Sequence, residues 1–316
     1  MPREKVLIIK PGYSETLVNE NNEVGKNTSL GDVLRSTVIL SLYKKEAFVT
    51  WVVDEKAIPL LKGNSCIHRI LPYDLTTVLQ LQAERFDTII NLEKVPGICA
   101  FSDSLTGWRR YGFRFDPESG DVLAYDGSHH VMELCLNKED KASNTKLWEE
   151  FLFEMVGAKW NGEMPILGYK PKSEELFEPF DIGFNHNVGE KWPIKAWPLE
   201  YWKELERLIG GGYTISWQEG LGSIEEYIDW INSCRILVTN DSLGLHIAHA
   251  LGKKVIALFG PTVSGEVYIK DGVKISPEPK PYCLPCMSNK CERGRSCMYD
   301  ISPGAVLDEI EKLMTR

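Results

Sequence analysis

The sequence predicts an α/β protein of two domains, each built around a parallel, doubly wound sheet. In both halves of the chain, short apolar runs rich in β-branched residues alternate with segments of helical periodicity, and this alternation is typical of parallel sheets covered by helices on both faces. A segment rich in proline and charge, residues 167–180, separates the halves. Because a length of 316 residues suits two domains of about 150 each, we place the domains at residues 1–168 and 169–316.

The composition is that of a soluble globular protein and argues against nucleic acid as a partner. A net charge of −9 is unfavourable for nucleic-acid binding, which needs a basic face. No apolar run approaches the roughly 20 residues that cross a bilayer, and the first residues, MPREKVLIIKPG, enter a strand pattern without the features of a signal peptide. We therefore expect a cytoplasmic protein with at most a peripheral membrane contact, made through local basic patches.

The N-terminal half starts with a predicted strand at residues 6–10 and continues as alternating elements. The further strands are expected at 47–53, 67–73 and 86–93, and the helices at 29–46, 55–63, 76–85 and 144–157. Between the first strand and the first helix, residues 13–28 are polar and without periodicity, which predicts a surface loop. This loop is a lid, a partner surface or decoration, and the sequence leaves the three open.

The C-terminal half repeats the pattern around the stretch 235–262. An apolar strand at 235–239 leads into the cap-type residues Asn240, Asp241 and Ser242, then into a helix, a second strand and a Gly-Pro-Thr turn. In such a βαβ unit the free N–H groups of the first helical turn favour an anion such as a diphosphate. A carboxylate at Asp241 suits sugar hydroxyls better than phosphate alone, which indicates a sugar carried by a nucleotide. The alternative is that Asp241 and Ser242 only cap the helix.

This stretch also carries a family resemblance. The pattern D-S-x-G-x-H, followed by A-x-A-L-G-K-x-V-x-A-L-F-G-P-T, resembles the donor-site signature of the heptosyltransferases, glycosyltransferase family 9. The chain departs from that signature at one place, because Leu243 stands where many members have glycine and Gly244 comes next. The resemblance implies a GT-B arrangement of two Rossmann-like domains facing a central cleft.

The resemblance also implies a function. It predicts an inverting, metal-independent glycosyltransferase of lipopolysaccharide biosynthesis that moves a sugar, heptose from ADP-heptose, to a hydroxyl of a glycan, lipid-linked or protein acceptor. Gly31 and Asp32 resemble the catalytic turn of the family, whose aspartate is the proposed general base. Direct displacement needs a base for the incoming hydroxyl, and a helix N-terminus keeps a carboxylate ionised. The alternative is that Asp32 is an ordinary acidic residue at a helix start.

The donor site is expected in the C-terminal domain. Lys195 opens a segment that resembles the K-x-W-P element of the family, in which the lysine meets the donor diphosphate, and a fixed cation there stabilises the departing nucleotide. Lys191, followed by its own Trp-Pro, is the rival for this role. His246 either orients the sugar or phosphate or packs within its helix, and Glu219 is the candidate for the ribose. The complete set of predicted donor residues is Lys195, Glu219, Asp241, Ser242, Gly244, His246 and Thr262.

Two further groups of residues have candidate roles. Arg109 and Arg110 resemble a basic segment that precedes a short strand in the family; they either meet an anionic acceptor or form a solvated surface pair. The spacing of four cysteines allows a tetrahedral Zn²⁺ or iron site, with free buried thiols or disulfides as alternatives; the cysteines are Cys283, Cys286, Cys291 and Cys297. A site of four thiolates leaves no open position, so the metal would be structural and catalysis would need no cofactor.

Two other classes of protein compete with the transferase. The first is a non-catalytic nucleotide-sugar-binding or assembly protein of the same fold. The second is a nucleotide-dependent dehydrogenase, which is disfavoured because VLIIKPG is not followed by the glycine fingerprint of dinucleotide-binding domains.

Overall fold

The computed structural model describes residues 3–13, 28–43, 47–172 and 179–315. The chain divides into two compact units, Met1–Lys141 with Lys146–Tyr169, and Ala142–Thr145 with Lys170–Arg316. The boundary that we place between residues 168 and 169 lies next to the division between Tyr169 and Lys170. The sequence did not predict that Ala142–Thr145 belongs to the second unit. Most of the predicted surface loop at 13–28 lies outside the described residues.

The sheet of the N-terminal unit has the strand order β3-β2-β1-β4-β5-β6 in the part of the chain that is described. All neighbouring strands are parallel except β5 and β6, which pair antiparallel. The strands are β1 (Glu4–Ile9), β2 (Ala47–Val53), β3 (Arg69–Pro72), β4 (Arg85–Asn91), β5 (Thr106–Phe115) and β6 (Val122–Ala124). The strand order reverses beside β1, so the carboxyl ends of β1 and β4 meet at the edge where doubly wound sheets bind ligands.

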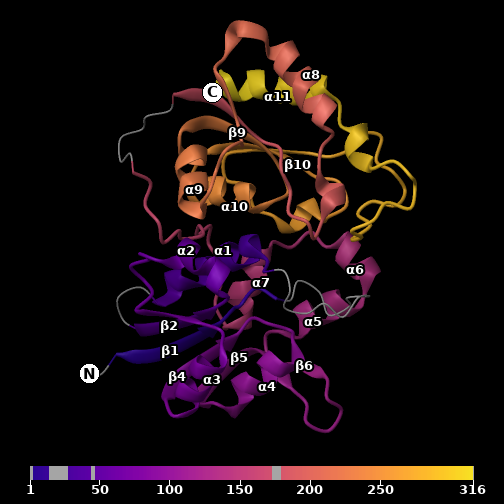
Figure 1. Cartoon of the computed structure of the whole chain (residues 1–316). Helices are drawn as coiled ribbons and strands as arrows, with labels where there is room; N and C mark the ends of the chain where they lie inside the picture. The colour runs from indigo at the N-terminus through magenta and orange to yellow at the C-terminus, as the bar shows by residue number, and fades with distance from the viewer. Residues whose placement is uncertain (1–2, 14–27, 44–46, 173–178, 316) are drawn as a thin grey trace. The chain divides into compact units, whose positions relative to one another are not determined.

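Helices cover both faces of this sheet (Figure 1). Alternate residues of β1 point to opposite faces: Val6 and Ile8 belong to the apolar core beneath α1 and α7, and Leu7 and Ile9 to the core beneath α3 and α4. The helical elements are α1 (Leu30–Ser36), η1 (Thr37–Tyr43), η2 (Glu55–Ala57), α2 (Ile58–Leu61), α3 (Leu75–Gln82), α4 (Pro96–Ser104), α5 (His129–Leu136), α6 (Lys138–Ser143) and α7 (Trp148–Met155).

The N-terminal unit differs from the predicted elements at several places. The helix expected over 29–46 tightens into a 3₁₀ segment at Thr37, whose Oγ1 donates to Leu34 O at 2.6 Å. The helix expected from 144 begins only at Trp148. Arg109 and Arg110 lie within the ten-residue β5 and not in a segment before a strand.

The sheet of the C-terminal unit is parallel throughout its described strands, with the order β11-β10-β9-β7-β8. Its strands are β7 (Phe180–Asn185), β8 (Ile215–Trp217), β9 (Cys234–Asn240), β10 (Lys254–Leu258) and β11 (Gly272–Ile275). Here the order reverses between β7 and β9. The last residues of these two strands, Asn185 and Asn240, are therefore neighbours at the ligand-binding edge.

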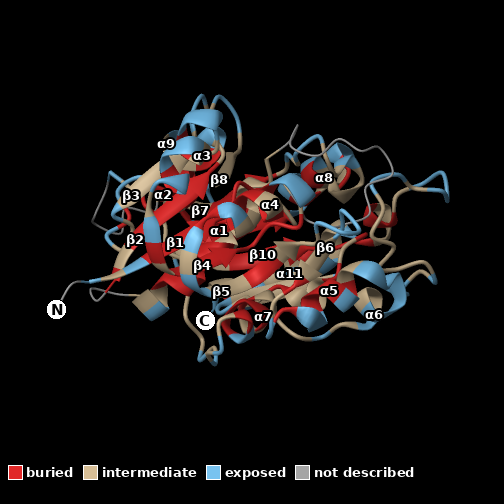
Figure 2. Cartoon of the chain, turned by 90° about the horizontal axis from the view of Figure 1, so that it is seen from below, coloured by how far each residue is buried: buried red, intermediate tan, exposed pale blue. Residues whose placement is uncertain are grey.

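The helices of this unit again form two layers around the sheet (Figure 1). On one face of the sheet, helices α8 and α11 pack against Phe184 and Val238 through Trp202, Leu205 and Ile310. Helices α9 and α10 lie on the other face. Figure 2 shows the strands between them as buried. The helical elements are η3 (Pro193–Lys195), α8 (Leu199–Ile209), η4 (Gly210–Gly212), α9 (Ile224–Asn232), α10 (Leu243–Ala250), η5 (Ser264–Glu266), η6 (Cys297–Asp300) and α11 (Pro303–Met314).

The prediction of an α/β protein with two doubly wound, parallel-dominated sheets is confirmed. Among the described residues, no helix is long and apolar enough to cross a membrane.

Candidate functional site

In the C-terminal unit, Asp241 is the centre of a polar cluster at the carboxyl edge of the sheet. Its Oδ2 accepts from Lys195 Nζ at 2.7 Å and from Thr262 Oγ1 at 2.7 Å. The Asp241 and Lys195 side chains are only 12% and 15% exposed. Three residues that are far apart in the sequence are thus brought together, and all three were predicted from sequence to belong to the donor site.

Asn240 explains why Lys195 reaches this position. The side chain of Asn240 accepts from Trp197 N at 2.9 Å and donates to His186 O at 2.9 Å. The Trp197 indole in turn donates to Ile301 O at 3.0 Å. The segment around Trp197 is therefore fastened to the end of β9 and to the chain before α11.

Ser242 and Gly244 meet a second buried polar group, Asn185 at the end of β7. Asn185 Nδ2 donates to Ser242 Oγ at 3.0 Å and to Thr239 Oγ1 at 2.6 Å, and Asn185 Oδ1 accepts from the Tyr227 hydroxyl at 2.6 Å. A Cβ on Gly244 would lie 2.3 Å from both Asn185 Nδ2 and Tyr227 Oη. The glycine one position later than in the signature thus lets helix α10 approach β7 closely.

Asp241 and Ser242 do not act only as caps of helix α10, which was the alternative role considered for them. Ser242 stands at the N-cap position of α10 without a side-chain capping bond, and the Asp241 carboxylate is directed to Lys195 and Thr262. Asn185 was missed from the sequence. The one available signal is a polar residue that ends an otherwise apolar strand beside the strand of Asp241.

The charge of Asp241 is stabilised by this cluster. Burial by itself would raise the pKa of the carboxyl, but Lys195, His246 and the Thr262 hydroxyl outweigh burial and lower it to about 2. His246 is 8% exposed and lies within electrostatic reach of Asp241. Glu219 follows β8 as an exposed residue, and the structure shows no contact of its carboxylate with the cluster.

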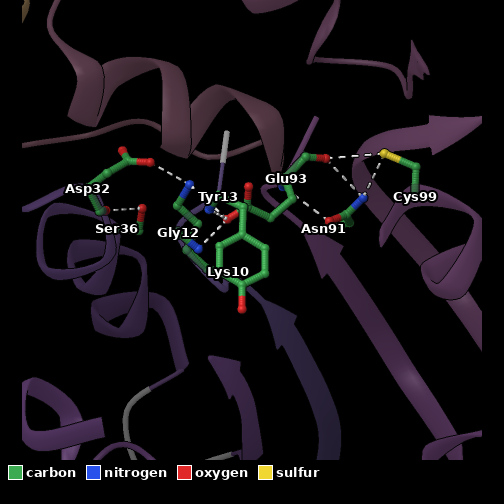
Figure 3. Close-up of polar contacts among 8 residues, drawn as sticks. All are labelled: Lys10, Gly12, Tyr13, Asp32, Ser36, Asn91, Glu93 and Cys99. Carbon is green, nitrogen blue, oxygen red and sulfur yellow. Dashed lines mark hydrogen bonds and ion pairs between the residues drawn. The ribbon is translucent and has the colours of Figure 1, made fainter. Parts of the chain in front are cut away.

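In the N-terminal unit, Asp32 belongs to an ion cluster that the sequence did not reveal (Figure 3). Lys10 follows β1 and is ion-paired with Asp32 in the first turn of α1, and its Nζ lies 3.2 Å from Glu93 Oε1. The exposed fractions are 1% for Lys10, 0% for Glu93 and 16% for Asp32. Asp32 is therefore the member of the three that a solute can reach.

The backbone around the cluster holds Glu93 in place. Glu93 Oε1 accepts from Gly12 N at 2.5 Å and Tyr13 N at 3.2 Å. Gly12 has a φ of +93°, a conformation that other residues rarely adopt, and this turn directs its N–H toward the carboxylate. The Asn91 side chain, at the end of β4, accepts from Glu93 N at 3.1 Å and donates to Phe113 O at 2.8 Å.

Lys10 and Asp32 stabilise each other in their ionised forms. Burial would raise the pKa of Asp32, but the ion pair with Lys10 and the charges of Arg35 and Lys94 lower it below its usual value. Burial would lower the pKa of Lys10, but Asp32 and Glu93 raise it above its usual value. Asp32 is thus a carboxylate, not a carboxylic acid, near neutral pH.

Comparisons with protein families, curated proteins and solved structures all find similarity to heptosyltransferases. The family model of glycosyltransferase family 9 (heptosyltransferase) matches residues 220–295. A lipooligosaccharide heptosyltransferase 2 of Campylobacter jejuni subsp. jejuni serotype O:6 is 34% identical over 85 residues, 26% of this chain and 27% of that protein. The E. coli heptosyltransferase WaaC, solved with ADP, has a TM-score of 0.66 and 17% identity, over 98% of this chain and 99% of that one.

The chain resembles the heptosyltransferases of glycosyltransferase family 9, and the match to the family model lies in its C-terminal unit. The resemblance predicted from its motifs is confirmed, and so is the fold, because the likeness to WaaC extends over both Rossmann-like units. The chain spans about a quarter to a third of the length of the first curated relatives that it matches. TibC of enterotoxigenic E. coli, an iron-containing dodecameric glycosyltransferase, shares the fold at a TM-score of 0.57 and 13% identity, over 99% of this chain and 76% of that one.

The four C-terminal cysteines lie near one another as free thiols. Burial and the neighbouring Cys283, Cys286 and Cys291 raise the pKa of Cys297 to about 11, which favours the protonated thiol. Cys291 Sγ donates to Arg295 O at 3.1 Å. Among the described residues, no three His, Cys, Asp or Glu side chains are arranged to hold a metal ion. The described side chains therefore do not fit a metal as they stand.

The Asp241 cluster leads to a prediction about acid stability. A folded-state pKa of about 2, below the unfolded value, stabilises the native state above pH 4, and this contribution is lost as the pH falls from about 4 towards 2. We expect Asp241→Asn to destabilise the protein by roughly 2 kcal/mol at pH 5.5 and by less at pH 3. Urea unfolding across this range measures the difference, with the exposed Asp126→Asn as control. A deficit that is the same at both pH values would contradict the prediction.

The cysteine spacing leads to a second prediction. If the thiols rearrange around Zn²⁺ or iron, anaerobically purified protein carries about one equivalent of metal. Cys286→Ser then loses this metal and melts at a lower temperature, while Cys135→Ser, outside the cluster, keeps it. Elemental analysis that finds no metal in the parent protein would assign all four cysteines as free thiols.

Proposed function

We propose that the protein is an inverting glycosyltransferase that transfers heptose from ADP-heptose to a hydroxyl of a glycan, lipid-linked or protein acceptor. The observation that carries this proposal is the presence of one lysine–aspartate cluster at the switch point of each Rossmann-like unit. One cluster has the properties of a donor site and the other those of a base. The transfer would take place on the cytoplasmic side of the membrane, with at most peripheral contact with it.

The Asp241 cluster supports the donor role. A lysine ammonium has three N–H donors, so Lys195 can keep its bond to Asp241 and still meet a phosphate oxygen. The N–H groups at the start of α10 lie beside this pair and favour the same anion. WaaC, whose fold this chain shares, was solved with ADP. Sugar hydroxyls would donate to Asp241, which stays ionised well below neutral pH.

The Asp32 cluster supports the base role. In a single displacement the acceptor oxygen bonds to the anomeric carbon while the bond from that carbon to the diphosphate breaks. The acceptor proton goes to Asp32, and the negative charge of the leaving diphosphate is stabilised by Lys195. No step in this scheme requires a metal ion, since a protein cation meets the leaving group and a carboxylate takes the proton.

A donor-site prediction separates the two candidate lysines. We expect Lys195→Ala to weaken ADP binding by roughly tenfold to a hundredfold, because a charge-assisted hydrogen bond to phosphate contributes about 1.5–3 kcal/mol. Lys191→Ala, the matched control, should change the affinity little. Calorimetric titration with ADP measures both. The reverse order would transfer the role to Lys191, and two small losses would remove both residues from the site.

The test of the enzyme itself is Asp32→Asn. Asparagine preserves the shape of the side chain but cannot take the acceptor proton, so turnover should fall by roughly 10²–10⁴ while folding and donor affinity survive. Sugar transfer from ADP-heptose and ADP affinity are measured on the same preparations. A variant that keeps more than about a tenth of the rate would make Asp32 an ordinary helix-start residue. A wild-type protein that binds donors but transfers nothing would be the non-catalytic binder instead.

A further inference from the structure

The Asp32 cluster contains one cation and two carboxylates. With all three groups ionised, Lys10 carries +1 while Asp32 and Glu93 carry −1 each, so the cluster holds a net charge of −1. Lys10 is 1% exposed and Glu93 is fully buried, so solvent screens neither of them. Proton uptake by Asp32 would change the net charge of the cluster to zero.

This charge count resolves a difficulty in the proposed mechanism. A base that is ion-paired with a buried cation is weakened, because protonating it would leave the cation without a partner. Breaking a buried ion pair by removing one charge is strongly unfavourable. Lys10 retains a second carboxylate 3.2 Å from its Nζ, so the protonated state of Asp32 leaves a complete Lys10–Glu93 pair.

We infer that Glu93 is a positioning residue for catalysis, the counter-charge that holds Lys10 and thereby lets Asp32 accept the acceptor's proton. This inference rests on the proposed role of Asp32 as the base. Glu93 itself is no second base, because its side chain is fully buried and its Oε1 is engaged by the backbone N–H groups of Gly12 and Tyr13.

The other charges around Asp32 make this counter-charge more necessary. Arg35, on the same helix, and Lys94, next to Glu93, both act on Asp32 in the same direction as Lys10. Arg35 also lies 3.9 Å from Glu149 of α7, which packs against α1. Lys94 lies over the rings of Phe113 and Trp148. Asp32 thus faces three cations, and Glu93 is the carboxylate bonded to the nearest of them.

A purely structural role for Glu93 gives a different expectation. Glu93 also ties the turn after β1 to the end of β4, so its loss could lower activity by loosening the site. Such loosening would reduce stability and turnover but would not move the ionisation of Asp32 in a defined direction. The direction of that movement is therefore the discriminating measurement.

The experiment uses Glu93→Gln, which keeps the carbonyl acceptor for Gly12 N and Tyr13 N but removes the charge. The environment of Asp32 becomes more positive, so we expect the acid limb of the kcat/KM profile to move to lower pH by about one unit. A weaker base should also lower kcat roughly threefold to tenfold, with the KM for the donor unchanged. Glu84→Gln, the same substitution in the surface pair with Arg69, should leave the acid limb unmoved.

A second measurement needs no substrate and therefore stands even if the proposed transfer activity is absent. In protein labelled with ¹³C at the aspartate carboxyl carbons, Asp32 is assigned by Asp32→Asn, and its titration midpoint is followed by NMR. Glu93→Gln should lower the midpoint. The double variant of Lys10→Met with Glu93→Gln, which removes the buried pair together, should raise it and also serves if the single variant does not fold.

The outcomes are distinct. A lowered midpoint with a shifted acid limb supports the role of Glu93. An Asp32 midpoint that stays in place or rises in Glu93→Gln, or fails to rise in the double variant, would overturn it. A wild-type protein without transfer activity but with the expected midpoints would reject the proposed function and keep the electrostatic coupling.

Discussion

The rest of the site depends on one constraint, the need of a buried ammonium group for carboxylate partners. Lys10 is 1% exposed at the end of β1, and an isolated charge there would cost several kcal/mol of desolvation. The parallel sheet supplies its partners: β4 lies beside β1, so Glu93 comes next to Lys10 although 83 residues separate them. The first turn of α1 brings Asp32 from the other side. The same topology places Asn185 beside the Asp241 segment in the second unit.

The two clusters differ in charge, and this difference suits different chemistry. The Lys10 cluster contains one cation and two carboxylates, so Lys10 keeps a carboxylate partner when Asp32 takes up a proton. Lys195 and Asp241 form a neutral pair, and beside it the N-terminus of α10 adds a partial positive charge. A diphosphate is attracted to the second arrangement and repelled by the first. Two similar ion pairs therefore acquire separate tasks from one additional carboxylate.

Local sequence patterns and the family resemblance were sufficient for the central strands of both sheets and for part of the candidate site. The strand 235–239, its helix and the turn at Thr262 follow from apolar runs and cap-type residues, and Lys195 from the K-x-W-P element that precedes α8. Lys10, Glu93 and Asn185 could not be found in this way, because each looks like a polar residue that ends a strand. Their meaning lies in which strand ends are adjacent, and no local pattern contains that information. The tightening at Thr37 was missed because a side-chain bond to Leu34 O decides it.

The residues that local rules missed are buried polar groups at strand ends. A buried ion cluster is often no more stabilising than apolar side chains of the same volume, and Glu93 adds a second negative charge to a site that α1 alone would fill with Asp32. The neighbouring positions Ile9 and Leu92 are apolar, but Glu93 also accepts from the backbone N–H groups of Gly12 and Tyr13 and so holds the turn after β1. A neutral carboxamide could accept from the same N–H groups, so the charge of Glu93 is better explained by its effect on Lys10 and Asp32 than by the fold of this turn.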